Sequence, residues 1–311
     1  MHCAGEGCII VAVRGKKGHE RQAIAVAERL GLAVRVVEHD AVDPARVTAA
    51  LVLAAGRQAI APARRIVRLP HPRPVVGVMQ PVAWRPSEFD FVWAPRHDRR
   101  LIDPGARSRI ETLTAPSAVG AAQRGAGRRR LAERGAPDGP ALGVLVGGAT
   151  RSHRFGPHEA ATLAADLAAC ARANGVALLV TTSGRTGGRQ AVTLREGLSE
   201  TRHLFVDAKD PDASLMYAGI LDVARAFVVT ADSVAMLSDA ATTGRPIFGW
   251  PLPGGKARFE RLYADLLAYG AMRWFDGEVP SWSYPPLDAA EEVAAAVRSQ
   301  LGLFDGAAQH R

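Results

Sequence analysis

Short apolar runs recur along the chain, separated by segments long enough to form a helix. In the first half these runs are residues 9–13, 33–37, 51–54, 75–79 and 91–94, and in the second half 142–146, 176–181, 203–206, 226–230 and 246–250. Continuous apolar runs are typical of parallel strands that are buried on both faces, and parallel strands need crossover connections. The pattern therefore predicts an α/β fold with two Rossmann-like, doubly wound sheets.

Apolar residues at helical spacing predict the crossover helices. They lie at residues 20–30 in the first half and at 157–173, 185–198, 214–223, 233–243 and 256–269 in the second. A last amphipathic segment, residues 287–301, carries Leu287, Val293, Val297 and Leu301 on one side. We expect this helix to pack back on the first domain.

A chain of 311 residues exceeds a typical single domain, so two hydrophobic cores are expected. Residues 113–140 are rich in Gly, Ala, Arg and Pro, which is typical of a linker. The predicted domains are therefore residues 1–137 and 138–285, followed by the C-terminal helix at 286–311.

The charge balance is strongly basic, with a net charge of +8 and 35 Arg beside only four Lys. A positive surface attracts phosphates and anionic lipid head groups. The densest basic run, residues 124–134, has no interleaved aromatic residue on which a base could stack. We therefore expect a solvated linker or helix face there, and no nucleic-acid partner. The Arg- and Ala-rich composition is typical of a high-GC bacterium.

Cysteine usage and hydropathy exclude several classes of protein. Cys3, Cys8 and Cys170 form no paired CxxC and have no nearby His to complete a zinc site. No stretch approaches the roughly 20 apolar residues that span a bilayer, and the first apolar run is too short for a signal peptide. We expect a cytoplasmic protein that needs no metal, with peripheral contact at the inner face of the membrane as an open alternative.

Three polar segments follow predicted strands of the second half, at residues 147–154, 182–186 and 230–239. Open parallel sheets bind ligands beyond the carboxyl ends of their strands, where helix N-termini present unpaired N–H groups. Paired glycines allow close approach of a ligand to the backbone. The predicted nucleotide- and phosphate-binding residues are Gly147, Gly148, Thr150, Arg151, Thr182, Ser183, Arg185, Asp232, Ser233, Asp239 and Lys256.

The segment at 230–239 is the most informative of the three. Asp232 or Ser233 is expected to cap the helix that follows, and Asp239, two turns in, to accept hydrogen bonds from ribose hydroxyls. The competing interpretation is a well-capped helix with a solvent-facing Asp239. Tight βα turns and N-cap clusters equally account for the other two segments.

Loops of the first half supply candidates for the acceptor side. Lys17 and Gly18 follow the first predicted strand, Arg57 follows the third, and Arg96 and His97 follow the fifth. His19 has an unperturbed pKa near neutrality, as a general base requires. Asp98 is the second candidate base, although either group can serve merely as a cap. No GxSxG elbow and no pair of hydrolase carboxylates is present.

These residues together resemble the mitochondrial-fission "elongated mitochondria" family and its bacterial relatives. The resemblance covers nearly the whole chain and depends on an ordered set of motifs. They are residues 15–22, AGR at 55–57, APRHD at 94–98, VGG at 146–148, TTS at 181–183, TADSV at 230–234 and LPGGKARF at 252–259.

The resemblance implies a glycosyltransferase-B architecture, in which two Rossmann-like domains face a cleft and the C-terminal one holds a nucleotide-diphosphate sugar. A Glu on the helix after the Thr-Ala-Asp-Ser-type turn often binds ribose in such proteins. Asp239 takes that position here and is one methylene shorter. Plant members of the family are associated with mitochondrial division, and bacterial members are commonly described only by fold or as sugar epimerases.

Three functions compete on this basis. The leading hypothesis is transfer of a sugar from a nucleotide-diphosphate sugar to an unidentified acceptor, without a cofactor or metal, in which His19 or Asp98 deprotonates the acceptor hydroxyl. A nucleotide-sugar 2-epimerase needs several carboxylates near the sugar, and the first-domain loops offer few. The third is a non-catalytic adaptor that docks on a membrane or a protein. Neither the acceptor nor the oligomeric state follows from these residues.

Overall fold

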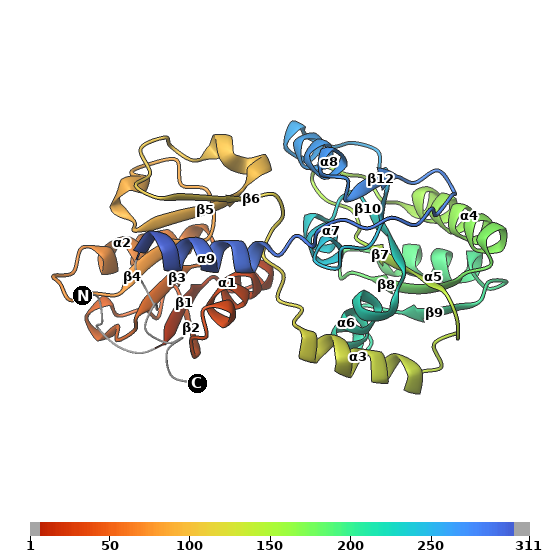
Figure 1. Ribbon diagram of the computed structural model, residues 1–311, viewed down its shortest axis with the longest axis horizontal. Coiled ribbons are helices and arrows are strands. Elements are labelled where there is room, and N and C mark those ends of the chain that lie inside the picture. The colour runs from red at the N-terminus through yellow and green to blue at the C-terminus, as the bar shows by residue number, and fades with distance from the viewer. Residues whose placement is uncertain (1–6, 302–311) are drawn as a thin grey trace. The chain divides into compact units, whose positions relative to one another are not determined.

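The computed structural model describes residues 7–301, so Cys3 lies outside the described part of the chain (Figure 1). Contacts divide the chain into two compact units. Unit 1 runs to Ala118 and resumes at Asp288, and unit 2 is Val119–Leu287. The chain therefore leaves unit 1, forms all of unit 2, and returns.

Unit 1 is built on a six-stranded parallel sheet with the order β2-β1-β3-β4-β5-β6. The strands are β1 (Cys8–Ala12), β2 (Val34–Glu38), β3 (Leu51–Ala54), β4 (Val75–Val78), β5 (Phe91–Pro95) and β6 (Arg109–Thr112). Alternate residues of a strand point to opposite faces. Ile10 packs in the cluster that includes helix α1 (Lys17–Arg29), whereas Ile9 and Val11 pack in the one that includes helix α2 (Ile60–Val67).

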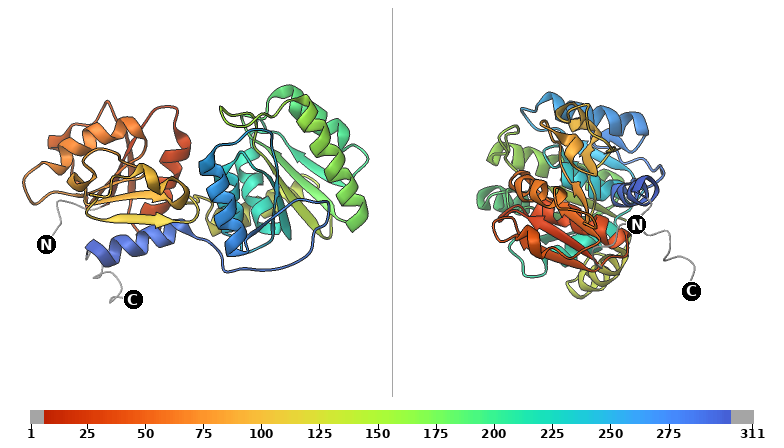
Figure 2. Two further views of the ribbon diagram at one scale, coloured as in Figure 1. Left: turned by 90° about the horizontal axis from the view of Figure 1, so that it is seen from above. Right: turned by 90° about the vertical axis from the view of Figure 1, so that its left-hand side faces the viewer.

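The returning helix α9 (Ala289–Leu301) completes the core of unit 1 (Figures 1 and 2). Its residues Val293 and Val297 are fully buried, in one cluster with Ala23 and Val26 of α1. At its start, Asp288 accepts from Arg29 at 2.7 Å. Unit 1 is thus assembled from two segments that are distant in sequence.

Unit 2 contains a second six-stranded parallel sheet, with the order β12-β11-β10-β7-β8-β9. The strands are β7 (Ala141–Val146), β8 (Ala177–Thr182), β9 (His203–Val206), β10 (Ala226–Thr230), β11 (Ile247–Trp250) and β12 (Met272–Trp274). The helices are α3 (Ala121–Glu133), α4 (Pro157–Asn174), α5 (Gly188–Gly197), α6 (Ala213–Val223), α7 (Val234–Ala241) and α8 (Ala257–Tyr269). This strand order is that of a dinucleotide-binding Rossmann sheet.

The segment predicted as a linker forms helix α3, which belongs to unit 2. The break between the units therefore follows Ala118 rather than residue 137. Helix α3 packs on α6 through glycine, because a Cβ atom at Gly127 would lie 2.2 Å from the carbonyl oxygen of Leu215. Only Gly127 and Leu131 of α3 are buried, so the helix has no apolar stripe for the pattern to detect.

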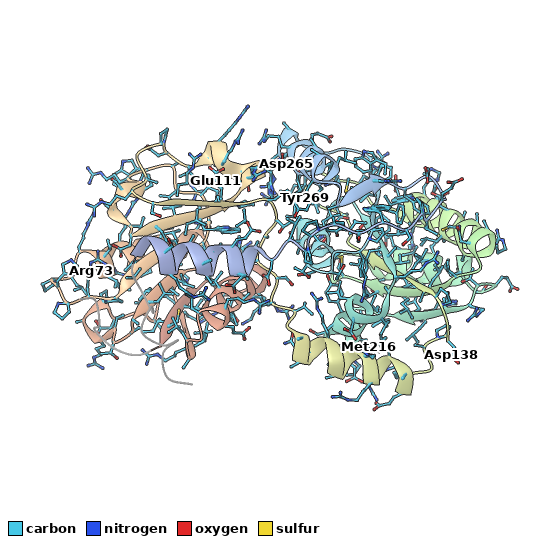
Figure 3. The ribbon with its side chains drawn as sticks, in the orientation of Figure 1. Arg73, Glu111, Asp138, Met216, Asp265 and Tyr269 are labelled. Atoms are coloured by element: carbon cyan, nitrogen blue, oxygen red, sulfur yellow. The ribbon has the colours of Figure 1, made fainter. Side chains whose placement is uncertain are left out.

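Strand β6, whose residues are Arg-Ile-Glu-Thr, was not predicted because it is polar, and strand β12 was not predicted because it has only three residues. The buried arginine and carboxylate residues that the structure describes, Arg73, Glu159 and Asp232, each have an ion-pair partner. Arg73, labelled in Figure 3, is buried and pairs with Asp90 at 2.7 Å. Asp90 also accepts from the amide of Val76 at 2.8 Å, which fixes the start of β4.

Candidate functional site

The loops after β7, β8 and β10 meet at one edge of the unit 2 sheet. Strand β7 lies between β10 and β8, and the chain adds strands β8 and β9 on one side of it before crossing to the other. The point where the direction of strand addition reverses is where open α/β sheets bind ligands. The three polar segments predicted to share an edge lie at this point.

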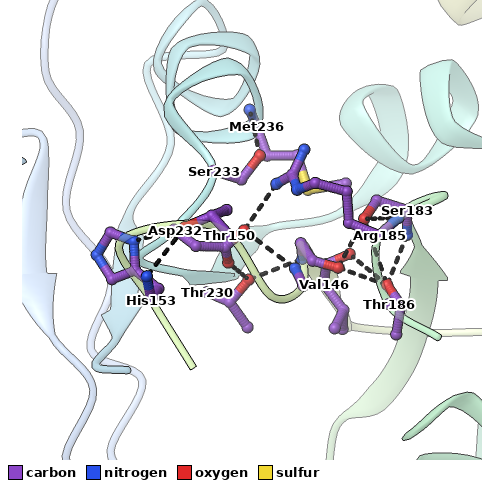
Figure 4. Close-up of polar contacts among 12 residues, drawn as sticks. Val146, Thr150, His153, Ser183, Arg185, Thr186, Thr230, Asp232, Ser233 and Met236 are labelled. Atoms are coloured by element: carbon purple, nitrogen blue, oxygen red, sulfur yellow. Dashed lines mark hydrogen bonds and ion pairs between the residues drawn. The ribbon is translucent and has the colours of Figure 1, made fainter. Parts of the chain in front are cut away.

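The backbone of Gly147 joins the three loops through the side chains of Thr230, Ser183 and Thr186, which are labelled in Figure 4. Its N–H donates to Thr230 Oγ1 at 2.7 Å, which connects the β7 loop to the β10 loop. Its carbonyl accepts from the hydroxyls of Ser183 and Thr186, which connects it to the β8 loop. Because the N–H and the carbonyl of Gly147 are both hydrogen-bonded to neighbouring loops, displacement of one loop must break a hydrogen bond to another.

Asp232 is the central charge of this edge, and its side chain is fully buried. One carboxylate oxygen accepts from Gly148 N at 3.0 Å and from the Arg185 guanidinium at 2.7 Å. The other oxygen accepts from Thr230 Oγ1 at 2.8 Å. A buried carboxylate is tolerated only with such partners, so Asp232 holds the loops together rather than facing a ligand.

The structure gives the paired glycines a role in the contact between the loops. A Cβ atom at Gly147 would lie 2.2 Å from an oxygen of Asp232, and one at Gly148 would lie 2.2 Å from the Arg185 carbonyl oxygen. The space that the missing side chains leave is filled by the protein itself. Glycine is required at both positions for contact between loops.

Three hydroxyl residues of the predicted set accept hydrogen bonds from backbone amides of the protein. Ser233 caps α7, since its Oγ accepts from Met236 N at 3.4 Å. Thr182 Oγ1 accepts from Ala208 N at 2.9 Å. Thr150 Oγ1 accepts from His153 N at 2.9 Å. Each of these hydroxyls already has a backbone partner.

Asp239, predicted to bind ribose, lies on α7 and is half-buried. It accepts a 2.8 Å hydrogen bond from the phenol of Tyr217 on α6. Burial raises the pKa of Tyr217 well above 10, and the neighbouring Asp239 carboxylate raises it further, so the phenol remains a donor. Asp239 thus joins two helices, which is a structural role that the sequence pattern did not reveal.

His153 is a buried member of the site that the sequence prediction missed. Its ring lies edge-on to Phe259 with 4.6 Å between centroids, and its Nε2 lies 3.3 Å from the Tyr263 hydroxyl. That hydroxyl donates to the Ala231 carbonyl at 2.7 Å, beside Asp232. The sequence offered little indication of this contact, because Tyr263 fits the apolar face of an amphipathic helix as any other apolar residue would.

Protonation of His153 should destabilise unit 2. Burial lowers the pKa of His153 below 6.5; nearby Asp232 and Glu260 oppose this, and Arg258 adds to it. A histidine with a lowered folded pKa favours the neutral form, so the free energy of unfolding declines as pH falls from about 6.5 toward that lowered value.

The decline of the free energy of unfolding at acidic pH should be smaller in His153→Gln, because glutamine cannot be protonated. Melting temperature measured by circular dichroism between neutral and mildly acidic pH tests the difference. The exposed residue His158 provides the control His158→Gln, which should follow the parent curve. If His153→Gln has the same pH dependence as the parent chain, His153 is not the group responsible.

Three cationic side chains of the predicted set are exposed at or beside this edge. Arg185 keeps 47% of its side chain exposed while it pairs with Asp232. Arg151 is exposed on the β7 loop, and Lys256 is exposed where α8 begins. The Lys256 loop adjoins the β7 loop, since Arg154 N donates to the Pro253 carbonyl at 2.9 Å. Three cations are therefore exposed at or beside a buried carboxylate that one of them, Arg185, neutralises.

In unit 1 the predicted residues occupy two places on the sheet. Gly18 and His19 lie in the first turn of α1, and Arg57 is exposed after β3, beside β1. Lys17 pairs with Glu20 at 2.9 Å. Burial, reinforced by the charge of Lys16, lowers the pKa of His19, so the imidazole is the neutral base at pH 7.

Arg96, His97 and Asp98 follow β5 in a short 3-10 helix, where His97 is buried and its Nε2 lies 3.8 Å from Asp98 Oδ2. Strands β3 and β4 separate β1 from β5. At about 4.8 Å per strand, the two loops start roughly 14 Å apart. His19 and Asp98 are therefore not members of one hydrogen-bonded pair.

No helix within residues 7–301 is long and apolar enough to cross a membrane. Among the side chains that the structure describes, no group of three or more His, Cys, Asp or Glu is arranged to hold a metal ion. Cys8 and Cys170 are both buried free thiols.

Two Rossmann-like units of this kind define a glycosyltransferase-B-like α/β protein, and solved structures share the fold. UDP-GlcNAc 2-epimerase from Methanocaldococcus jannaschii is similar with a TM-score of 0.57 and 10% sequence identity, covering 94% of this chain and 99% of that chain. A structure of the M. jannaschii enzyme in complex with UDP-GlcNAc and UDP gives a TM-score of 0.53.

Residues 17–301 match the family described as "Mitochondrial fission ELM1", and the chain belongs to that family. It is 27% identical over 275 residues to "Mitochondrial fission protein ELM1" of Arabidopsis thaliana, covering 81% of this chain and 64% of that protein. It is 23% identical over 164 residues to "Uncharacterized protein RP120" of Rickettsia prowazekii (strain Madrid E), covering 51% of this chain and 46% of that protein. The matches thus span about half to two thirds of the relatives' length.

Proposed function

We propose that unit 2 binds a nucleotide-diphosphate sugar at the edge formed by the loops after β7, β8 and β10, and that the protein transfers the sugar to an acceptor. The observation that carries this proposal is the position of the Asp232 cluster at the reversal point of the sheet. The bound UDP-GlcNAc and UDP of the M. jannaschii structure support a ligand of this class on a related fold.

The electrostatics of the edge are suited to a diphosphate. Asp232 is neutralised by Arg185, while Arg151 and Lys256 remain exposed nearby. Helix α7 adds the positive end of its dipole and its first N–H groups, of which Ser233 satisfies only that of Met236. A leaving diphosphate would be stabilised by these charges and dipoles.

Within this proposal, His19 is the preferred base for the acceptor hydroxyl. Its lowered pKa keeps the imidazole neutral at physiological pH, and its Nδ1 is buried without a hydrogen-bond partner. Asp98 remains the alternative base, and Lys17, Gly18, Arg57, Arg96 and His97 the proposed acceptor-side residues.

Nucleotide binding is the direct test. A ligand at 100 times its Kd should stabilise the protein by about 2.7 kcal/mol. We expect a thermal shift with nucleoside diphosphates of one base and their sugars, strongly reduced in Arg185→Gln and retained in Arg189→Gln. Arg189 is an exposed residue at the start of α5 and is the matched control. If none of the nucleotides raises the melting temperature, the proposal is wrong.

A non-catalytic adaptor is the second candidate, favoured by the internal use of Gly147 and Gly148. Spaces that could admit a phosphate are filled by Asp232 and by the Arg185 backbone. Release of nucleoside diphosphate from a nucleotide sugar in the presence of a cell extract separates the two functions. Turnover supports transfer, whereas binding without turnover supports the adaptor.

A further inference from the structure

Unit 1 carries an exposed aromatic residue within a group of arginines. Trp84 is 59% exposed, more than any other large hydrophobic residue of the described chain. Its indole contacts two guanidinium groups, with Arg64 4.4 Å and Arg85 4.7 Å from the ring centroid. Arg64 also donates to the Trp84 carbonyl, so the loop is held with its indole exposed.

A second exposed apolar residue lies on the adjoining segment. Leu101 is 53% exposed at the end of the 3-10 helix that follows β5, directly after the exposed Arg99 and Arg100. The amide of Asp103 donates to the Val82 carbonyl at 3.1 Å. Trp84 and Leu101 are each two residues from this bond, so they belong to one region of the surface.

These side chains define the Trp84 patch, which consists of Trp84, Leu101, Arg64, Arg85, Arg99 and Arg100. Glu88 is an acidic residue that contacts it, and Arg64, Arg68 and Arg85 all approach its carboxylate within 4 Å. Several guanidinium groups therefore share one carboxylate. The patch combines two exposed apolar side chains with an excess of positive charge.

We infer that the Trp84 patch docks unit 1 on an anionic lipid bilayer. Indole rings favour the level of the lipid head groups, where one part of the ring is apolar and the other is wet. Arginine supplies charge complementary to anionic lipid at the same level. Leu101 can enter the acyl boundary, whereas an aliphatic chain offers a nucleic acid no flat face for stacking. This inference does not depend on the proposed sugar transfer.

Vesicle sedimentation of the full chain tests the inference. The parent protein should pellet with phosphatidylcholine vesicles that contain phosphatidylserine and remain in solution with phosphatidylcholine alone. High salt should weaken the binding, because salt screens the attraction between charges. The screening length is about 8 Å at physiological ionic strength and becomes shorter as salt is added. Trp84→Ser should bind less than the parent protein, and Arg99→Gln/Arg100→Gln should lose roughly 30-fold in partitioning, about fivefold per arginine.

Matched variants on unit 2 serve as controls. Arg129→Gln/Arg134→Gln removes two exposed arginines, and Val192→Ser removes an apolar side chain that is 52% exposed. Both should bind vesicles as the parent does, and circular dichroism should show all variants folded. Equal binding by patch and control variants overturns the inference, as does a parent that ignores anionic vesicles. Patch variants that lose only oligonucleotide binding, or only self-association in sedimentation velocity, likewise overturn it.

Discussion

Asp232→Ala should destabilise unit 2 by about 3 kcal/mol, the cost of leaving buried donors without their acceptor. Gly148 N and Thr230 Oγ1 would lose their bonds inside the protein, whereas Arg185 is half exposed and can turn to water. For a unit of this size the loss corresponds to a melting temperature lower by roughly 6–12 °C.

The control for this variant is Asp166→Ala. Asp166 also accepts a hydrogen bond, from Trp250 Nε1 at 2.9 Å, but it is only half-buried and has that one donor. We expect Asp166→Ala to lower the free energy of unfolding by about 1 kcal/mol. Calorimetry or chemical unfolding of both variants measures the difference, and equal losses would show that Asp232 does not hold the three loops together.

Gly127→Ala should open the contact between α3 and α6 and cost about 3 kcal/mol, because the neighbours of the added methyl group are backbone atoms that cannot rotate away. The new Cβ would lie 2.2 Å from the Leu215 carbonyl oxygen and 2.3 Å from Gly219 N. Gly219→Ala should act similarly, since its Cβ would lie 2.4 Å from the Gly127 backbone.

Gly125→Ala, two residues away on the same helix, is the matched control. Nothing lies within 4 Å of a Cβ atom at this position. Alanine in a helix interior should stabilise by about 0.5–1 kcal/mol relative to glycine. Urea unfolding distinguishes the two variants by the sign of their effect, and a Gly127→Ala protein as stable as Gly125→Ala would rule out close packing of these helices.

The sequence predicted the fold class well because buried parallel strands give a strong signal. All ten predicted strands exist, and the C-terminal amphipathic segment forms α9. Strand β6 and helix α3, which were not predicted, lacked that signal. Strand β6 is polar, and α3 packs through the absence of side chains at Gly127 rather than through an apolar stripe.

The meeting of the three loops at one edge of the sheet was predicted from the sequence, whereas the contacts that their side chains make were not. Residues 147–154, 182–186 and 230–239 meet at one edge, as parallel topology requires. Strand order alone could not reveal that Asp232 turns inward to Gly148, or that Asp239 bonds Tyr217, because both contacts depend on side-chain direction. A polar residue after a strand is equally compatible with ligand contact and with loop closure.

The two-segment construction of unit 1 has a consequence for biosynthesis. Helix α9 follows the whole of unit 2 in the chain, so a ribosome releases it last among the elements that form the first core. At 5–20 residues per second, the six strands of unit 1 would wait on the order of ten seconds or more for the helix that covers Ala23 and Val26. Unit 2 is continuous and ends before α9 begins, so it can fold before unit 1 is complete, and until then the exposed face of the nascent sheet is a natural target for chaperones.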